Sequence, residues 1–220
     1  MTAVTGRDEG LIHVPAGAVS LEGNLLIPGL ATGVVLFAHG SGSSRFSSRN
    51  RYVAEVLREG GMGTLLLDLL TQEEELVDTR TAHLRFDIEL LADRLVAAVQ
   101  WLAREKATER LKVGLFGAST GAGAALVAAA RLPDRISAIV SRGGRPDLAG
   151  AALPNVKAPT LLIVGGEDEP VIQMNQQAYE RMTAPREIVI VPGATHLFEE
   201  PGALETVARL ARDWFQRYLR

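Results

Sequence analysis

The feature that most constrains the fold of this chain is a repeated alternation of apolar, strand-like runs with helix-like segments. The pattern predicts six buried strands, at 33–38, 64–69, 112–116, 136–140, 160–164 and 187–191. It predicts five helices, at 49–59, 84–104, 119–131, 173–182 and 204–218. The strand runs are continuously apolar, as buried parallel strands are. We therefore predict an α/β protein with a mostly parallel central sheet and helices on both faces.

The remaining organisation of the sequence is simple. Residues 11–28 alternate in polarity and contain glycines, which predicts a β-hairpin at the edge of the sheet. A chain of 220 residues without repeats or linkers fits a single domain over residues 1–220. In such a sheet, functional side chains lie beyond the carboxyl ends of the strands.

Composition excludes several classes of partner and chemistry. The net charge is −3 with dispersed Lys and Arg, which disfavours a nucleic-acid or membrane partner. The chain has no cysteine, so disulfides, thiolate metal sites and a cysteine nucleophile are excluded. There is no secretory leader pattern and no apolar run long enough to span a bilayer, so we expect a cytoplasmic protein. We also expect no metal or cofactor, because the sequence lacks a zinc motif, a dinucleotide fingerprint and a P-loop.

Residues 111–131 join a strand-like run to an alanine-rich, helix-like run. The junction reads G-x-S-x-G over residues 117–121, with Ser119 at its centre. In a strand-turn-helix setting this sequence places a serine on a sharp turn as an exposed nucleophile. We therefore predict that Ser119 is a catalytic nucleophile.

A serine hydroxyl needs a base to accept its proton, and the base needs a partner that orients it. His196 follows the last predicted strand, and Asp168 follows the strand before it. The chain order of Ser119, Asp168 and His196 is that of α/β-hydrolases. Glu167 and Glu169 are alternatives to Asp168, since three consecutive acids in a loop often form only a solvated surface.

An oxyanion hole needs two backbone N–H groups directed at the developing negative charge. One is predicted at Thr120, which follows the nucleophile. The other is predicted in the loop after the first buried strand, at Ser41, with Gly40 as the second choice. His39, just before this loop, is expected to be a hydrogen-bonded scaffold residue.

The segments AHGSGSS, GASTGAG, VGGEDEPV and PGATHLFEEPG together resemble the α/β-hydrolase superfamily. Within it the chain is similar to the small lidless proteins related to dienelactone hydrolase. The resemblance implies an α/β-hydrolase fold, a Ser119, Asp168, His196 triad and an oxyanion hole at Ser41 and Thr120. It also implies hydrolysis of carboxylic esters or lactones through an acyl-enzyme, without a cofactor. Dienelactone hydrolase itself has cysteine at the nucleophile position, which argues against dienelactone as the substrate of this chain.

Other features bear on the substrate. About 18 residues separate the strands near 141 and 160, which leaves little room for a lid and predicts an open site for small esters. Arg142 and Arg145 follow a strand end, and Arg45 lies in the predicted oxyanion loop. All three are candidates to bind a substrate carboxylate; the alternative is that they form structural ion pairs. The acidic run at 72–75 is expected to be a solvated loop. Acyl transfer to another nucleophile, perhydrolysis and ligand sensing stay open as functions, and the oligomeric state is not predicted.

Overall fold

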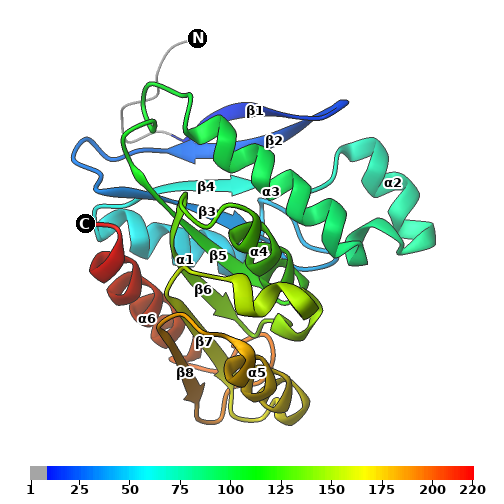
Figure 1. The fold of residues 1–220 in the computed structure, drawn as a ribbon, viewed down its shortest axis with the longest axis vertical. Helices are drawn as coiled ribbons and strands as arrows, with labels where there is room; N and C mark the ends of the chain where they lie inside the picture. Colours follow the sequence, from blue (N-terminus) through cyan, green and yellow to red (C-terminus); the bar gives the residue numbers. More distant parts are fainter. Residues whose placement is uncertain (1–8) are drawn as a thin grey trace.

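The centre of the computed structural model, which describes residues 9–220, is an eight-stranded sheet (Figure 1). The strand order is β1-β2-β4-β3-β5-β6-β7-β8. The strands are β1 Gly10–Ala16, β2 Val19–Leu26, β3 Gly33–Ala38, β4 Gly63–Leu67, β5 Lys112–Ala118, β6 Ile136–Arg142, β7 Thr160–Gly165 and β8 Arg186–Val191. Strand β2 is antiparallel to β1 and β4, and all other pairs are parallel. The predicted parallel sheet with an edge hairpin is confirmed.

Helices cover both faces of the sheet. They are α1 Ser48–Glu59, α2 Gln72–Thr81, α3 Ile88–Leu102, α4 Thr120–Arg131, α5 Glu169–Arg181 and α6 Ala203–Tyr218, with short 3-10 helices η1 Leu84–Phe86 and η2 Pro146–Asn155. Helices α3 and α4 pack in the hydrophobic cluster on one face, and α1 and α6 pack in the cluster on the other (Figure 1). None of the helices within residues 9–220 is both long enough and apolar enough to cross a lipid bilayer.

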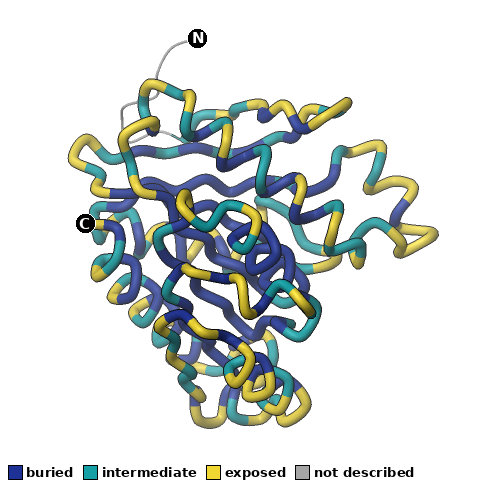
Figure 2. Tube along the Cα trace, viewed as in Figure 1, coloured by how far each residue is buried: buried dark blue, intermediate teal, exposed yellow. Residues whose placement is uncertain are grey.

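Strand β3 shows why the strand sequences are continuously apolar. Val34, Leu36 and Ala38 contribute to the cluster under α3 and α4. Val35 and Phe37 contribute to the cluster under α1 and α6. Because side chains alternate between the two faces of a sheet, both faces must be apolar when both are covered by helices. The resulting buried layer runs through the middle of Figure 2.

The acidic run at 72–75 is not a loop, and that prediction is wrong. It forms the first turn of α2, where the Thr71 hydroxyl accepts the Glu74 N–H at 3.2 Å and Glu74 accepts the Thr71 N–H at 2.8 Å. This reciprocal capping and the favourable position of acids at a helix N-terminus stabilise the helix. Only Asp78 is buried in α2, so the sequence has no apolar stripe that would have revealed a helix.

One further helix differs from the sequence prediction, whereas the connection expected to lack a lid agrees with it. The segment predicted as one helix over 84–104 is divided into η1 and α3, because Asp87 caps α3 by accepting the Leu90 N–H at 3.0 Å. The connection from β6 to β7 contains only η2 and therefore carries no lid domain, as predicted.

Candidate active site

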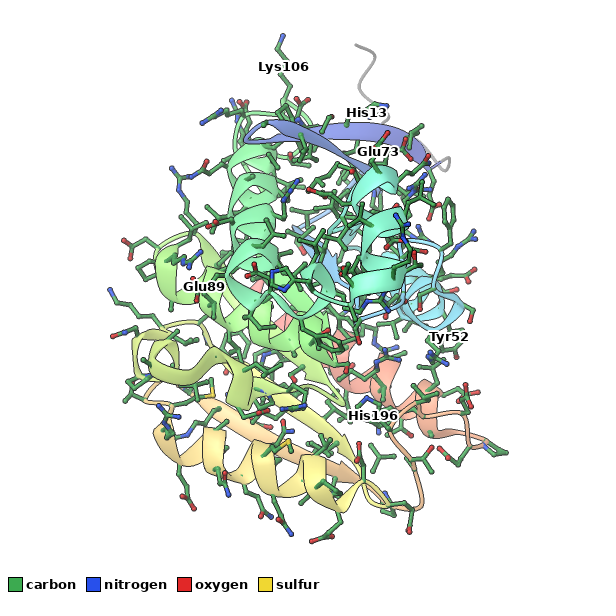
Figure 3. The ribbon with its side chains drawn as sticks, turned by 90° about the vertical axis from the view of Figure 1, so that its right-hand side faces the viewer. His13, Tyr52, Glu73, Glu89, Lys106 and His196 are labelled. Carbon is green, nitrogen blue, oxygen red and sulfur yellow. The ribbon has the colours of Figure 1, made fainter. Side chains whose placement is uncertain are left out.

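Strands β5, β7 and β8 run in the same direction, so their carboxyl ends meet at one edge of the sheet. Ser119 directly follows β5, Asp168 lies three residues after β7, and His196 lies five residues after β8. In Figure 3 the right-hand side of Figure 1 faces the viewer, and His196 is labelled. The topology thus brings together three residues that are far apart in the sequence.

The backbone at Ser119 adopts a conformation that is rare for a residue with a side chain, with φ 50° and ψ −123°. Two glycines allow this turn. A Cβ at Gly117 would lie 2.4 Å from Cα of Ala122, and one at Gly121 would lie 2.3 Å from the carbonyl oxygen of Ala38. The G-x-S-x-G pattern therefore has a steric cause: neither flanking position has space for a side chain. A strained backbone of this kind is typical of functional sites.

His196 and Asp168 are directly hydrogen-bonded. The distance between Nδ1 of His196 and Oδ2 of Asp168 is 2.6 Å. Because an ionised carboxylate only accepts hydrogen bonds, Nδ1 carries the proton and Nε2 of the neutral ring is left as the basic nitrogen. The Asp168 side chain is 14% exposed and that of His196 is 37% exposed. Glu167 and Glu169 are exposed, so Asp168 is the acid of this run that contacts His196.

The loops that carry Asp168 and His196 are fixed against each other by their backbones. The N–H of Gly166 donates to the Val191 carbonyl at 2.8 Å, and the N–H of Glu167 donates to the Ala194 carbonyl at 2.9 Å. A Cβ at Gly165 would lie 2.4 Å from the Ala194 oxygen. The glycines at the end of β7 thus permit the close approach that places the carboxylate beside the imidazole.

The two predicted oxyanion donors lie on adjoining segments. A Cβ at Gly40 would lie 3.0 Å from Cβ of Ser119, so the loop after β3 runs directly against the turn at Ser119. The Ser41 N–H donates to Oγ1 of Thr120 at 2.9 Å. The Thr120 N–H has no acceptor among residues 9–220. One predicted donor is therefore free and the other is engaged by the side chain of its neighbour.

His39 has the scaffold role expected from the sequence. Its Nδ1 lies 3.0 Å from the Gly40 carbonyl, and its Nε2 accepts the Leu69 N–H at 3.1 Å. This pair of bonds requires a neutral ring with the proton on Nδ1. Burial lowers the pKa of His39, which favours the same neutral form. His39 thereby links the loop after β3 to the end of β4.

Ser119 and His196 line the same cavity, of about 230 Å³, together with Ser41, Arg49 and Arg142. The other lining residues are Gly40, Ser43, Ser47, Ala118 and Leu197. Sequence reasoning selected Arg142 but missed Arg49. Arg49 lies in the first turn of α1, where nothing in its local pattern distinguishes it from a solvated arginine.

Arg45, another arginine predicted to bind substrate, does not line this cavity. Its guanidinium forms ion pairs with Glu22 at 2.6 Å and with Asp68, and it donates to Asn24 at 3.1 Å. The Arg45 N–H also donates to Asp68 at 2.6 Å. These bonds fix the loop after β3 to β2 and to the end of β4, which is the structural alternative considered for this residue.

A second cavity, of about 300 Å³, is also lined by the loop after β3. It shares Gly40, Ser41 and Ser43 with the cavity of Ser119. Its apolar lining consists of Leu69, Leu70 and Leu91, and its polar lining includes residues of α2 and η1. The two cavities therefore adjoin along the loop that carries a predicted oxyanion donor.

Known proteins resemble this chain in both sequence and structure. A crystal structure of dienelactone hydrolase from Anabaena variabilis ATCC 29413 is 65% identical, with a TM-score of 0.96 over 97% of this chain and 99% of that chain. The α/β hydrolase GrgF from Penicillium sp. sh18 is 14% identical and shares the fold, with a TM-score of 0.80 over 96% of this chain and 99% of that chain.

A curated relative from Mycobacterium tuberculosis, strain H37Rv, carries the provisional name phosphoribosyl transferase. It is 58% identical over 213 residues, which are 97% of this chain and 47% of the relative. The chain thus spans about half the length of this relative. The family model described as the dienelactone hydrolase family matches residues 23–220. Sequence, fold and this match together show that the chain belongs to the dienelactone hydrolase family.

Proposed function

We propose that this protein is a serine hydrolase that cleaves small carboxylic esters or lactones through an acyl-enzyme on Ser119. The observation that carries the proposal is the 2.6 Å bond between His196 and Asp168 beside a cavity that also contains Ser119. A nucleophile, a base and a residue that orients the base are the parts needed for acyl transfer. Membership of the dienelactone hydrolase family supports hydrolysis as the overall reaction.

In the acylation step, Oγ of Ser119 attacks the carbonyl carbon and Nε2 of His196 accepts the hydroxyl proton. Asp168 stabilises the resulting imidazolium through the bond to Nδ1. The tetrahedral oxyanion accepts hydrogen bonds from the N–H of Thr120 and from the N–H of Ser41, which gives up its bond to Oγ1 of Thr120 to do so. The intermediate then expels the alcohol oxygen, which takes the proton from His196.

In the deacylation step, water attacks the acyl-enzyme while His196 again accepts a proton. Collapse of the second tetrahedral intermediate returns that proton to Ser119 and releases the carboxylic acid. With a lactone, the alcohol and the acid are parts of one product. No metal or cofactor enters either step.

The size of the site supports small substrates. The cavity of Ser119 has a volume of about 230 Å³, and the connection from β6 to β7 adds no lid above it. The adjoining cavity of about 300 Å³ offers space for one further apolar group. We expect turnover to fall for acyl chains of about ten carbons or more in a p-nitrophenyl ester series. A preference for such chains would contradict this expectation.

The same residues could pass the acyl group to an alcohol, an amine or a peroxide instead of water, and product analysis with these nucleophiles distinguishes the reactions. The name phosphoribosyl transferase belongs to relatives about twice as long as this chain, and no feature of the Ser119 site supports that activity here. Hydrolysis is therefore the function that the site supports best.

A fluorophosphonate probe tests the proposal without a choice of substrate. We expect one adduct, located on Ser119 by peptide mapping and lost in the His196→Ala variant. A His83→Ala variant is the matched control, because His83 is exposed and lies outside the cavity. Absence of an adduct on folded protein would refute an activated serine and would favour ligand sensing.

A further inference from the structure

The cavity of about 300 Å³ has no role in the catalytic steps, although it adjoins the site of Ser119. Three buried leucines line it, Leu69, Leu70 and Leu91, and we call it the leucine pocket. Its exposed side chains, Glu75 and Thr79, belong to α2. Figure 1 shows α2 next to the beginning of α3, the helix that carries Leu91. An apolar lining with a few polar groups is typical of a pocket that binds a small molecule.

The leucine pocket lies beside the predicted oxyanion donors. Ser41 and Thr120 both line it, together with Gly40. Gly40 and Ser41 also line the cavity that contains Ser119 and His196. Ser119 and His196 themselves do not line the leucine pocket. A group bound there is therefore next to the oxyanion and away from the catalytic base.

The tetrahedral intermediate determines which part of a substrate can enter this pocket. Its central carbon carries Oγ of Ser119, the oxyanion, the alcohol oxygen and the acyl group. The alcohol oxygen takes its proton from His196, so the alcohol has to stay in the cavity that His196 lines. The acyl group has no such requirement and is attached to the same carbon as the oxyanion. It is therefore the acyl group that can extend into the leucine pocket.

The charges around the leucine pocket favour an uncharged acyl group. Asp78 and Arg85 line the pocket as an ion pair, in which Nε of Arg85 donates to Oδ2 of Asp78 at 2.5 Å. The carboxylate of Glu75 is exposed at the same pocket and would repel an acyl group that carries a carboxylate of its own. The remaining lining favours methylene groups, because the leucines offer only apolar surface.

We propose that the leucine pocket is the acyl-binding site, so that the preferred substrates are esters of uncharged aliphatic acids of about four to six carbons. This inference rests on the proposed function of Ser119. Leu91 is then a specificity-determining residue, because it limits the length of the acyl chain and takes no part in proton transfer.

Two ester series separate the acyl group from the alcohol. In the first, the acid of a p-nitrophenyl ester is lengthened from acetate to decanoate. In the second, the alcohol of an acetate ester is lengthened from ethyl to hexyl. We expect wild-type kcat/KM to rise about three- to fourfold with each methylene from acetate to hexanoate, and to rise less in the alcohol series. The same rise in both series, or none in the acyl series, would overturn the inference.

Leu91→Ala lengthens the pocket. We expect the preferred acyl chain to become longer by about two carbons, with no change of preference in the alcohol series. Leu95→Ala is the matched control, because Leu95 is a buried leucine one turn further along α3 that does not line the pocket. It should lose similar stability and keep the wild-type preference. An equal shift in both variants would show that the leucine pocket does not set the chain length.

A surface substitution gives the opposite change without disturbing the core. Thr79→Trp places a large side chain at the pocket, and should lower the ratio of kcat/KM for hexanoate over acetate about tenfold. Thr81→Trp is the matched control on α2. Thr81 is also exposed, its hydroxyl also donates to a backbone carbonyl of the helix, and it does not line the pocket. An unchanged ratio in Thr79→Trp, with wild-type folding, would overturn the inference even if Leu91→Ala did not fold.

The charge of the acyl group is tested with the mono-p-nitrophenyl ester of glutaric acid and with p-nitrophenyl pentanoate, which has the same chain length. We expect the glutarate ester to have the lower kcat/KM, and Glu75→Gln to reduce the difference. Glu73→Gln is the control, because Glu73 is exposed on α2 and does not line the leucine pocket. A higher kcat/KM for the glutarate ester in the wild type would refute the preference for uncharged acyl groups.

Inhibition by n-alkylboronic acids tests the pocket without an alcohol. The boron atom forms a tetrahedral adduct with Oγ of a reactive serine, and its alkyl group then stands in the place of the acyl chain. We expect the inhibition constant to fall about three- to fourfold per methylene from ethyl to pentyl in the wild type, and this dependence to be lost in Thr79→Trp. Inhibition without dependence on chain length would refute the acyl site and leave Ser119 as the nucleophile. Absence of both inhibition and ester hydrolysis would refute the function of Ser119 itself.

Discussion

The N–H of Ser41 donates a hydrogen bond to the hydroxyl of Thr120 at 2.9 Å, which joins the loop after β3 to the first residue of α4. Both residues are predicted to supply N–H groups to one oxyanion. The hydroxyl of Thr120 therefore accepts the N–H of Ser41. That N–H is expected to donate to the oxyanion together with the backbone N–H of Thr120. The bond to the hydroxyl fixes the orientation of the Ser41 peptide before substrate binds.

We predict that Thr120→Val lowers kcat about fivefold, because the Ser41 peptide loses a bond worth about 1 kcal/mol that orients it. Thr120→Ser keeps a hydroxyl and should stay close to wild type. Steady-state kinetics on one neutral p-nitrophenyl ester measure both variants. A rise of kcat in Thr120→Val would show instead that the hydroxyl competes with the oxyanion.

Replacing Asp168 by Asn should lower kcat about 10²- to 10⁴-fold while the protein stays folded, since the amide can no longer fix the His196 tautomer. The matched control is Glu167→Gln, which removes the neighbouring, exposed carboxylate. The kinetics are compared with circular dichroism of each variant. Full activity in Asp168→Asn would mean that the acid is misassigned.

The Ser119 backbone conformation predicts a difference between two inactive variants. Ser119→Ala keeps a Cβ at φ 50°, whereas Ser119→Gly removes it. We expect the glycine variant to have a free energy of unfolding about 1 kcal/mol higher than the alanine variant, because relief of strain exceeds the entropy cost of glycine. Urea unfolding measures the difference. Equal stabilities would indicate that the turn is not strained.

Much of this fold could be predicted because the burial of strands on both faces leaves a clear signal in the sequence. Strand β3 is buried throughout, and its six residues are all apolar or glycine. Helix α2 could not be predicted in the same way. Asp78 is its only buried residue, and the hydrogen bonds of its N-terminal capping box stabilise it. Local hydrogen bonds at a helix end do not produce an apolar period.

The candidate site was predictable to the extent that its residues follow predicted strands. Asp168 and His196, which are hydrogen-bonded to each other, were predicted from their positions after strand ends. The roles of the arginines were not, because an ion pair depends on residues brought together only by the fold. Arg45 meets Glu22 and Asp68 across three elements, while Arg142 meets no acid.

The different surroundings of the arginines predict different effects on stability. Arg45→Met leaves Asp68 and Glu22 without their cation, and should lower the free energy of unfolding by about 1–3 kcal/mol. Because Arg45 lies outside the Ser119 cavity, kcat/KM for neutral and anionic esters should fall equally or stay unchanged. Urea unfolding measures the free energy of unfolding, and steady-state kinetics with a neutral and an anionic p-nitrophenyl ester measure kcat/KM. A selective loss on anionic esters would return Arg45 to the substrate site.

The buried neutral His39 predicts a dependence of stability on pH. Burial lowers the pKa of His39 below its ordinary value of 6.5, so as the pH falls the unfolded chain binds a proton before the folded protein does. The contribution of His39 to stability is thus complete above about pH 6.5 and is lost progressively below it, by up to about 1.4 kcal/mol per pH unit. Urea unfolding between about pH 7.5 and pH 5.5 measures this slope.

In His39→Gln the slope over this range should become smaller, although the variant is less stable at neutral pH because the bonds to Gly40 and Leu69 are altered. His83→Gln is the matched control, because His83 is exposed. It should keep the wild-type slope. The same slope in His39→Gln and wild type would show that His39 accepts a proton equally well in the folded and unfolded chain. The two bonds would then not be what keeps the ring neutral.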